Sequence, residues 1–189
     1  MKLKIPNILT IGRIILVPIF IATFYLPGAV GHWITFIIFV LASFTDFLDG
    51  LLARLYKEES KLGELLDPVA DKIIVASALV LLVMDDTIKD YEVVAAIIII
   101  IREILISGLR EFLAKVQVTI PVTKLSKFKT FIQMFAIAIL LTRESGNKII
   151  HLGDYNAHTF GIILLWLAAF LTIYTGYDYV KKRIHLALD

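Results

Sequence analysis

The chain has 189 residues, of which 59% are hydrophobic and 19% charged, and its formal net charge is +2. Ordinary soluble domains are about 45–50% apolar and about 25% charged, so this composition and a mean hydropathy of +0.85 indicate a protein dissolved in lipid. The apolar content excludes a disordered chain, and the absence of cysteine excludes a disulfide scaffold, a thiolate metal site and a cysteine nucleophile.

Six apolar segments approach the roughly 20 residues that a membrane-spanning helix requires. In chain order, we expect them at about residues 8–25, 33–56, 68–84, 93–113, 127–142 and 160–180. The predicted fold class is an all-α integral membrane protein with six transmembrane helices, a single membrane domain over residues 1–189. Residues 1–10 predict a short interfacial segment. Arg13 interrupts the first apolar run, which argues against a cleaved signal peptide.

The basic residues gather in alternate loops, which sets the expected orientation. One set of loops and termini carries Lys2, Lys4, Arg54, Lys57, Lys61, Arg110, Lys115, Lys124, Lys127, Lys129, Lys181, Lys182 and Arg183. The other loops carry only Lys89, Arg143 and Lys148. Because lysine and arginine are enriched on the cytoplasmic side of membrane proteins, both termini are predicted to be cytoplasmic. The expected location is the cell membrane.

Four aspartates occupy the facing ends of the second and third segments, where carboxylates are costly and suggest a functional site. Asp46 and Asp49 are three residues apart, so they share one helix face. Asp67 and Asp71, four residues apart, share a face of the next helix. Because a short loop joins the two segments, the helices must be antiparallel neighbours. The four carboxylates can therefore converge at the cytoplasmic end.

Such a cluster stays ionised only when cations are bound to it. The cluster contains neither histidine nor cysteine, so its hard oxygen ligands favour Mg²⁺, Mn²⁺ or Ca²⁺ over zinc or copper. Four shared carboxylates can hold two ions about 3.5–4 Å apart, an arrangement used for phosphoryl displacement. The expected cofactor is a pair of Mg²⁺ or Mn²⁺ ions.

Small residues accompany the first aspartate pair. Gly50 and Ala53 lie on the helix face of Asp46, where they leave a groove beside the predicted ions. Arg54 follows at the helix end and could bind a phosphate or pair with a carboxylate. Each feature has a structural alternative, an Asp49–Arg54 surface pair and a small-residue packing site. The whole set within 26 residues favours the functional interpretation.

The run Asp46-x2-Asp49-Gly50-x2-Ala53-Arg54-x8-Gly63-x3-Asp67-x3-Asp71 resembles the signature of the CDP-alcohol phosphotransferases at all eight fixed positions. The resemblance implies a six-helix membrane fold, usually a homodimer, with a two-metal site facing the cytoplasm. It also implies that an alcohol hydroxyl attacks the β-phosphorus of a CDP-linked lipid and that CMP leaves.

The resemblance implies a role for each residue that matches a position of the family signature. The implied metal ligands are Asp46, Asp49, Asp67 and Asp71, and Asp71 would also be the catalytic base. The implied CDP contacts are Asn7, Thr10, Gly50, Ala53, Arg54 and Gly63.

Three further segments, residues 5–13, 102–112 and 127–134, resemble the bacterial phosphatidylglycerophosphate synthases of that family. This resemblance implies CDP-diacylglycerol as donor and sn-glycerol 3-phosphate as acceptor, with no nucleic-acid partner. An anionic acceptor needs cationic groups, and the expected acceptor-phosphate contacts are Arg110, Lys127, Lys129 and Thr130. The last three also begin a helix, where backbone N–H groups favour phosphate. Alternatively, the lysines are positive-inside residues that touch anionic membrane lipids.

The same residues also allow other functions. The same chemistry could use phosphatidylglycerol, giving cardiolipin, or inositol phosphate as acceptor. A cation transporter would also place carboxylates in the membrane, but its acids should follow a path rather than cluster at one face. A purely structural membrane module is a third class.

The sequence also predicts the surroundings of four further polar side chains. Arg102 could have a functional role or belong to an internal ion-pair network, and Glu103 is expected to belong to that network. Lys72 should extend to the interface or pair with Glu64 or Glu103. His158 is predicted to be a solvated loop residue on the far side.

Overall fold

The computed structural model describes residues 5–56, 61–115, 123–149, 151–152 and 155–183. Its helices are α1 (Ile5–Phe24), α2 (Gly28–Tyr56), α3 (Lys61–Met84), α4 (Glu92–Lys115), α5 (Lys124–Leu141), α6 (Arg143–Asn147) and α7 (Ala157–Arg183). A two-residue hairpin, β1 (His151–Leu152) paired antiparallel with β2 (Tyr155–Asn156), precedes α7. The described part of the chain is therefore almost entirely helical.

Each of the six apolar segments falls on one of the long helices. Each helix begins one to seven residues before its segment, because charged and small residues can continue a helix beyond its apolar part. Residues 5–10 continue into α1 without a break, so the described part of the predicted interfacial segment is helical, and its place at the membrane interface stays a prediction. Neither α6 nor the hairpin was predicted, since five residues and two pairs of residues are too short to give a periodic pattern.

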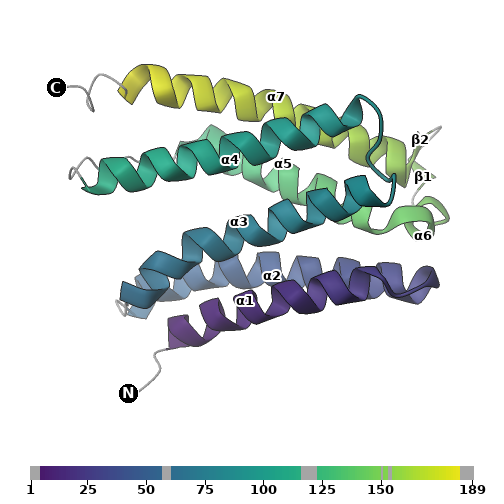
Figure 1. Ribbon diagram of the computed structural model, residues 1–189, viewed down its shortest axis with the longest axis horizontal. Coiled ribbons are helices and arrows are strands. Elements are labelled where there is room, and N and C mark those ends of the chain that lie inside the picture. Colours follow the sequence, from purple (N-terminus) through teal and green to yellow (C-terminus); the bar gives the residue numbers. More distant parts are fainter. Residues whose placement is uncertain (1–4, 57–60, 116–122, 150, 153–154, 184–189) are drawn as a thin grey trace.

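The long helices run side by side along the length of the molecule (Figure 1). At one end of the molecule, which we call the α2–α3 end, α2, α4 and α7 end and α1, α3 and α5 begin. The turn between α1 and α2, the α3–α4 turn, α6 and the hairpin lie at the other, the α6 end (Figure 1). An up-and-down arrangement of six long helices places the start of α1 and the end of α7 at the same end.

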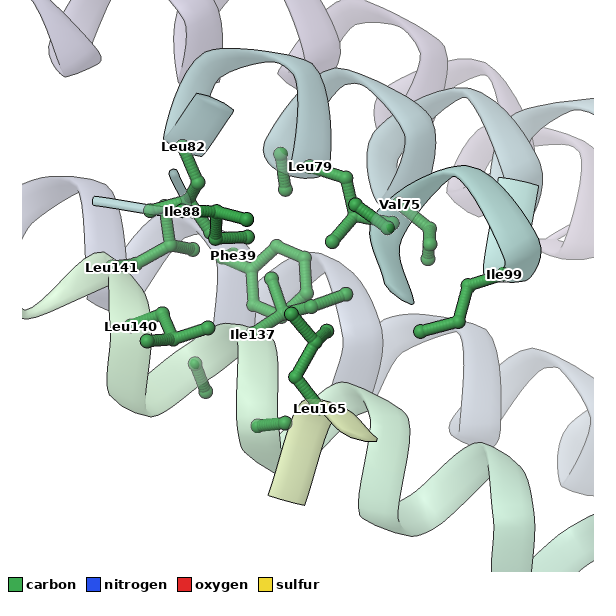
Figure 2. Close-up of a cluster of buried hydrophobic side chains, with 14 of the residues drawn as sticks. Phe39, Val75, Leu79, Leu82, Ile88, Ile99, Ile137, Leu140, Leu141 and Leu165 are labelled. Carbon is green, nitrogen blue, oxygen red and sulfur yellow. The ribbon is translucent and has the colours of Figure 1, made fainter. Parts of the chain in front are cut away.

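The core lies where α2, α3, α5 and α7 meet. Figure 2 shows the side chain of Phe39 surrounded by aliphatic side chains from α3, α4, α5 and α7. Phe39, Leu79 and Leu165 are at most 1% exposed. In lipid, such side chains stabilise the bundle by close van der Waals packing rather than by removal from water. Packing of these side chains fixes how the helices lie beside one another.

Large apolar side chains also cover the outside of the bundle. On α4, the exposed apolar residues include Ile97, Ile101, Ile104 and Leu105, and every other long helix carries some as well. A soluble monomer rarely exposes a continuous apolar surface of this kind, so the outer surface suits lipid. By length and composition, two described stretches could each cross a membrane: Gly28–Thr45 in α2 and Ala157–Lys181 in α7. The protein is thus an α-helical membrane protein.

Candidate active site

The four signature aspartates lie on two helices that meet at the α2–α3 end. Asp46 and Asp49 lie in the second half of α2, and Asp67 and Asp71 lie in the first half of α3. The two helices are in contact and run in opposite directions (Figure 1). The backbone therefore brings the two pairs to the same end of the bundle, as the short loop between them predicts.

The side chains of these aspartates lie outside the described part of the structure. The same holds for all the predicted CDP contacts, Asn7, Thr10, Gly50, Ala53, Arg54 and Gly63. Among the side chains that are described, no group of three or more His, Cys, Asp and Glu residues could hold a metal ion. The predicted ligand set, which is all carboxylate, fits Mg²⁺ or Mn²⁺ by the chemistry of its donors.

The residues predicted to bind the acceptor lie at the same end, on α4 and α5. Thr123 caps the start of α5, where its hydroxyl accepts a hydrogen bond from the Ser126 amide at 3.2 Å. Lys127 and Thr130 are exposed, and the Thr130 hydroxyl donates to the Ser126 carbonyl at 3.0 Å. Arg110, also exposed, lies near the end of α4 with its guanidinium 5.9 Å from the centre of the Tyr179 ring.

Lys129 differs from these neighbours because its side chain is buried. Only 2% of that side chain is exposed, and its Nζ pairs with Oε1 of Glu103 on α4. Lys127 lies about 200° around the helix from Lys129, so the two lysines point to nearly opposite sides of α5. The structure thus separates the predicted acceptor contacts into an exposed set and one interior lysine.

Glu103 is the centre of an internal ion-pair network, as predicted. The Nη1 atom of Arg102 lies 3.5 Å from the same Oε1 atom that Lys129 contacts. Lys72 on α3 interacts electrostatically with this carboxylate, which agrees with the predicted pairing of Lys72 with Glu64 or Glu103. The network joins α3, α4 and α5 inside the bundle.

Two residues of α7 complete the network, and the sequence pattern did not indicate them. The Nη2 atom of Arg102 donates to the Thr175 hydroxyl at 3.3 Å. Next to it, a Cβ atom on Gly176 would lie 3.3 Å from the Cγ of Arg102, so this glycine lets the arginine lie against α7. The one sequence signal is the dipeptide Thr175-Gly176, because a small polar residue beside a glycine in an apolar helix can mark a place where another side chain packs.

A polar cavity of about 520 Å³ lies at the α6 end, away from the signature aspartates. His158 lines it and is not a solvated loop residue, so that prediction is wrong. It is half-buried in the first turn of α7, and its Nε2 lies 2.7 Å from the Thr87 carbonyl oxygen. The Asn147 side chain accepts from the His158 amide at 2.8 Å. The cause is the length of α7, which begins three residues before the predicted segment.

Arg143 also lines this cavity and holds several helix ends together. Its Nε lies 2.8 Å from Oδ2 of Asp85, and its Nη2 donates to the Phe24 carbonyl at 3.3 Å. The guanidinium lies 3.5 Å from the centre of the Phe24 ring. Burial lowers the pKa of Arg143, and the Asp85 carboxylate opposes that shift. The residue adopts a positive φ of 49°, a costly conformation that these contacts maintain.

Comparison with known proteins covers nearly the whole chain. The family model for CDP-alcohol phosphatidyltransferase matches residues 3–174. A protein of Rickettsia felis is 44% identical over 178 residues, which are 94% of each chain. A protein of Haemophilus influenzae is 43% identical over 191 residues, covering 100% of this chain and 98% of the relative.

A third relative, from Cereibacter sphaeroides, is 37% identical over 221 residues, covering 100% of this chain and 99% of its own. All three relatives are named CDP-diacylglycerol–glycerol-3-phosphate 3-phosphatidyltransferase. Similarity of this extent, together with the eight signature positions on α2 and α3, shows that the chain belongs to the CDP-alcohol phosphatidyltransferase family of membrane enzymes.

Proposed function

We propose that this enzyme transfers the phosphatidyl group of CDP-diacylglycerol to sn-glycerol 3-phosphate, giving phosphatidylglycerophosphate and CMP. The observation that carries this proposal is the near full-length identity of 37–46% to relatives named for this reaction. The reaction forms a bond between the acceptor oxygen and the β-phosphorus. It breaks the bond from that phosphorus to the oxygen that leaves with CMP.

Asp71 is proposed as the base that takes the proton of the attacking hydroxyl. With Asp46, Asp49 and Asp67 it would hold two Mg²⁺ or Mn²⁺ ions. When bound, the ions would neutralise the charge that develops on the diphosphate. The support is the spacing of the aspartates and the position of both pairs at one end of α2 and α3. A carboxylate at the edge of such a site is within the usual repertoire of general bases.

The proposed CDP contacts lie on α1, α2 and α3, and most are close in sequence to the aspartates. Gly50 and Ala53 follow the first aspartate pair by less than two helical turns and would let the nucleotide approach the α2 backbone. Arg54 would pair with the diphosphate. Gly63 on α3 and the α1 residues Asn7 and Thr10 complete the proposed set.

The acceptor phosphate is proposed to bind where α4 ends and α5 begins. Arg110, Lys127 and Thr130 are exposed there and can donate to an anion. Lys129 would contribute its charge from the interior, where Glu103 holds it. A phosphate dianion needs such cations, and a neutral alcohol acceptor does not.

We further propose that all six long helices span the cell membrane with the α2–α3 end in the cytoplasm. Basic residues gather at this end, among them the exposed Arg110, Lys124 and Lys127, as the positive-inside rule requires. The proposed assembly is a homodimer surrounded by membrane lipids, as the family resemblance implies.

The purified protein in mixed micelles, given CDP-diacylglycerol, Mg²⁺ and labelled glycerol 3-phosphate, tests the proposal. We expect CMP release that matches the label recovered in lipid. CMP release only with phosphatidylglycerol or inositol phosphate would assign a different acceptor. Cation flux in liposomes without nucleotide turnover would instead favour a transporter.

A further inference from the structure

Glu103 lies at the meeting point of three helices in the bundle interior, and it has no place in the proposed chemistry. Its side chain is 20% exposed, and its Oε1 contacts both Lys129 of α5 and Arg102 of α4. The two cations are themselves 2% and 16% exposed. One carboxylate therefore faces two largely buried cations, and Lys72 of α3 adds a third nearby charge.

The position of Lys129 depends on this carboxylate. Removing an ammonium group from water costs several kcal/mol unless an anion and hydrogen bonds compensate. Lys129 lies near the start of α5, and its long side chain could reach the surface at little cost if nothing held it inside. Its neighbours Lys127 and Thr130 do point outward. Pairing with Glu103 stabilises the Lys129 charge in the interior.

Glu103 is in turn held from the other side by Arg102. The guanidinium of Arg102 reaches from Glu103 to the Thr175 hydroxyl on α7, and Gly176 gives it room there. The carboxylate thus has a fixed position between α5 and α7. It also lies near Lys72, the residue that follows the proposed base Asp71 in α3.

We propose that Glu103 is a positioning residue for the acceptor: it holds Lys129 inside the bundle, directed toward α3 and α4, where the acceptor phosphate must lie to bring its hydroxyl to Asp71. This inference rests on the proposed function. Three cations, Lys129, Arg102 and Lys72, lie around this one carboxylate, so a phosphate dianion that enters here would meet several positive charges. Glu103 acts on the reaction only through Lys129.

Kinetics of the purified full-length enzyme with Glu103→Gln test this role. We expect the KM for glycerol 3-phosphate to rise about 10- to 100-fold, the usual effect of misplacing one binding group. The KM for CDP-diacylglycerol should stay within about twofold, because the donor contacts are on α1, α2 and α3. Glu92→Gln, on the same helix at the α6 end, is the matched control and should leave both constants unchanged.

A double-mutant cycle with Lys129→Met tests whether Glu103 acts through that lysine. Lys129→Met should raise the same KM, and adding Glu103→Gln to it should raise it no further. Glu103→Asp, which keeps the charge on a shorter side chain, should recover part of the loss. If Glu103→Gln does not fold, Glu103→Asp and the double variant, which removes the Lys129 charge together with that of Glu103, still decide the question.

Two results would overturn the inference. One is an unchanged KM for glycerol 3-phosphate in Glu103→Gln with only a lower thermal midpoint, which would make the role structural. The other is a KM for glycerol 3-phosphate that Glu103→Gln raises by the same factor in the parent enzyme and in Lys129→Met. If the parent enzyme itself releases no CMP with glycerol 3-phosphate, the proposed function fails first, and that result is distinct from either of these.

Discussion

Arg143 and Asp85 form an ion pair that joins α6 to the turn after α3, with Nε and Oδ2 2.8 Å apart. The pair lies at the opposite end of the bundle from the signature aspartates, and both side chains are largely buried, with exposures of 15% and 22%. A second oxygen of Asp85 accepts from the Thr87 amide at 3.2 Å. Helix ends that are far apart in the sequence are thus tied together by a few polar contacts.

Asp85→Asn should destabilise the protein by about 1–3 kcal/mol, because it leaves the half-buried Arg143 without its counter-charge. Asp86→Asn is the control, since Asp86 is exposed and its positive φ of 59° suits asparagine. Thermal denaturation in detergent, followed by tryptophan fluorescence, should give a lower midpoint for the first variant only. Equal midpoints would show that the pair does not stabilise the α6 end.

Gly161→Ala should also destabilise the protein, by about 1–3 kcal/mol from overpacking. A Cβ atom at Gly161 of α7 would lie 2.7 Å from Cδ2 of Leu140, which is 1% exposed on α5. Gly108→Ala on α4 meets nothing within 4 Å and should be neutral or stabilising by up to about 1 kcal/mol. The same thermal assay compares the two. A stable Gly161→Ala variant would mean that the Leu140 side chain or the α5–α7 packing adjusts at little cost.

Asp71→Asn should reduce CMP release by at least about 10²–10⁴-fold while the protein still folds, because the amide cannot accept the hydroxyl proton. The thermal midpoint and the chromatographic behaviour check folding. Asp90→Asn, at an exposed position of the α6 end with a φ of 50°, should retain the parent rate. Turnover near the parent rate in Asp71→Asn would remove Asp71 from the role of base.

Chelation of divalent ions should abolish CMP release, since the carboxylate cluster would then lack its counter-charges. Dialysis against EDTA followed by addition of Mg²⁺ or Mn²⁺ should restore the rate. Zn²⁺ should restore it poorly, because all the proposed ligands are carboxylates. Full activity after chelation would contradict a metal-dependent reaction.

The membrane orientation can be tested with single cysteines, because the chain has none of its own. We expect Lys148→Cys, exposed near the α6 end, to react with a membrane-impermeant maleimide in right-side-out vesicles. Lys127→Cys, exposed at the α2–α3 end, should react only in inside-out vesicles. The reverse labelling pattern would invert the proposed orientation. Labelling of both from one side would contradict an odd number of spans between them.

The sequence by itself determined the helical membrane class, the position of each long helix and the candidate chemistry. These follow from local properties. An apolar run of about 20 residues has few alternatives to a helix in lipid, and carboxylates at a spacing of three or four share one helix face. The eight signature positions lie within 26 residues, so they can be recognised without knowledge of distant contacts.

Tertiary structure decided what no local pattern encodes. Lys127 and Lys129 look alike in the sequence, yet only Lys129 is buried, because Glu103 lies opposite it on α4. In the same way, Arg143 and His158 belong to a polar junction formed by residues as much as 119 positions apart. A buried charge is stable only where a partner from another helix meets it, and that meeting depends on how the helices pack.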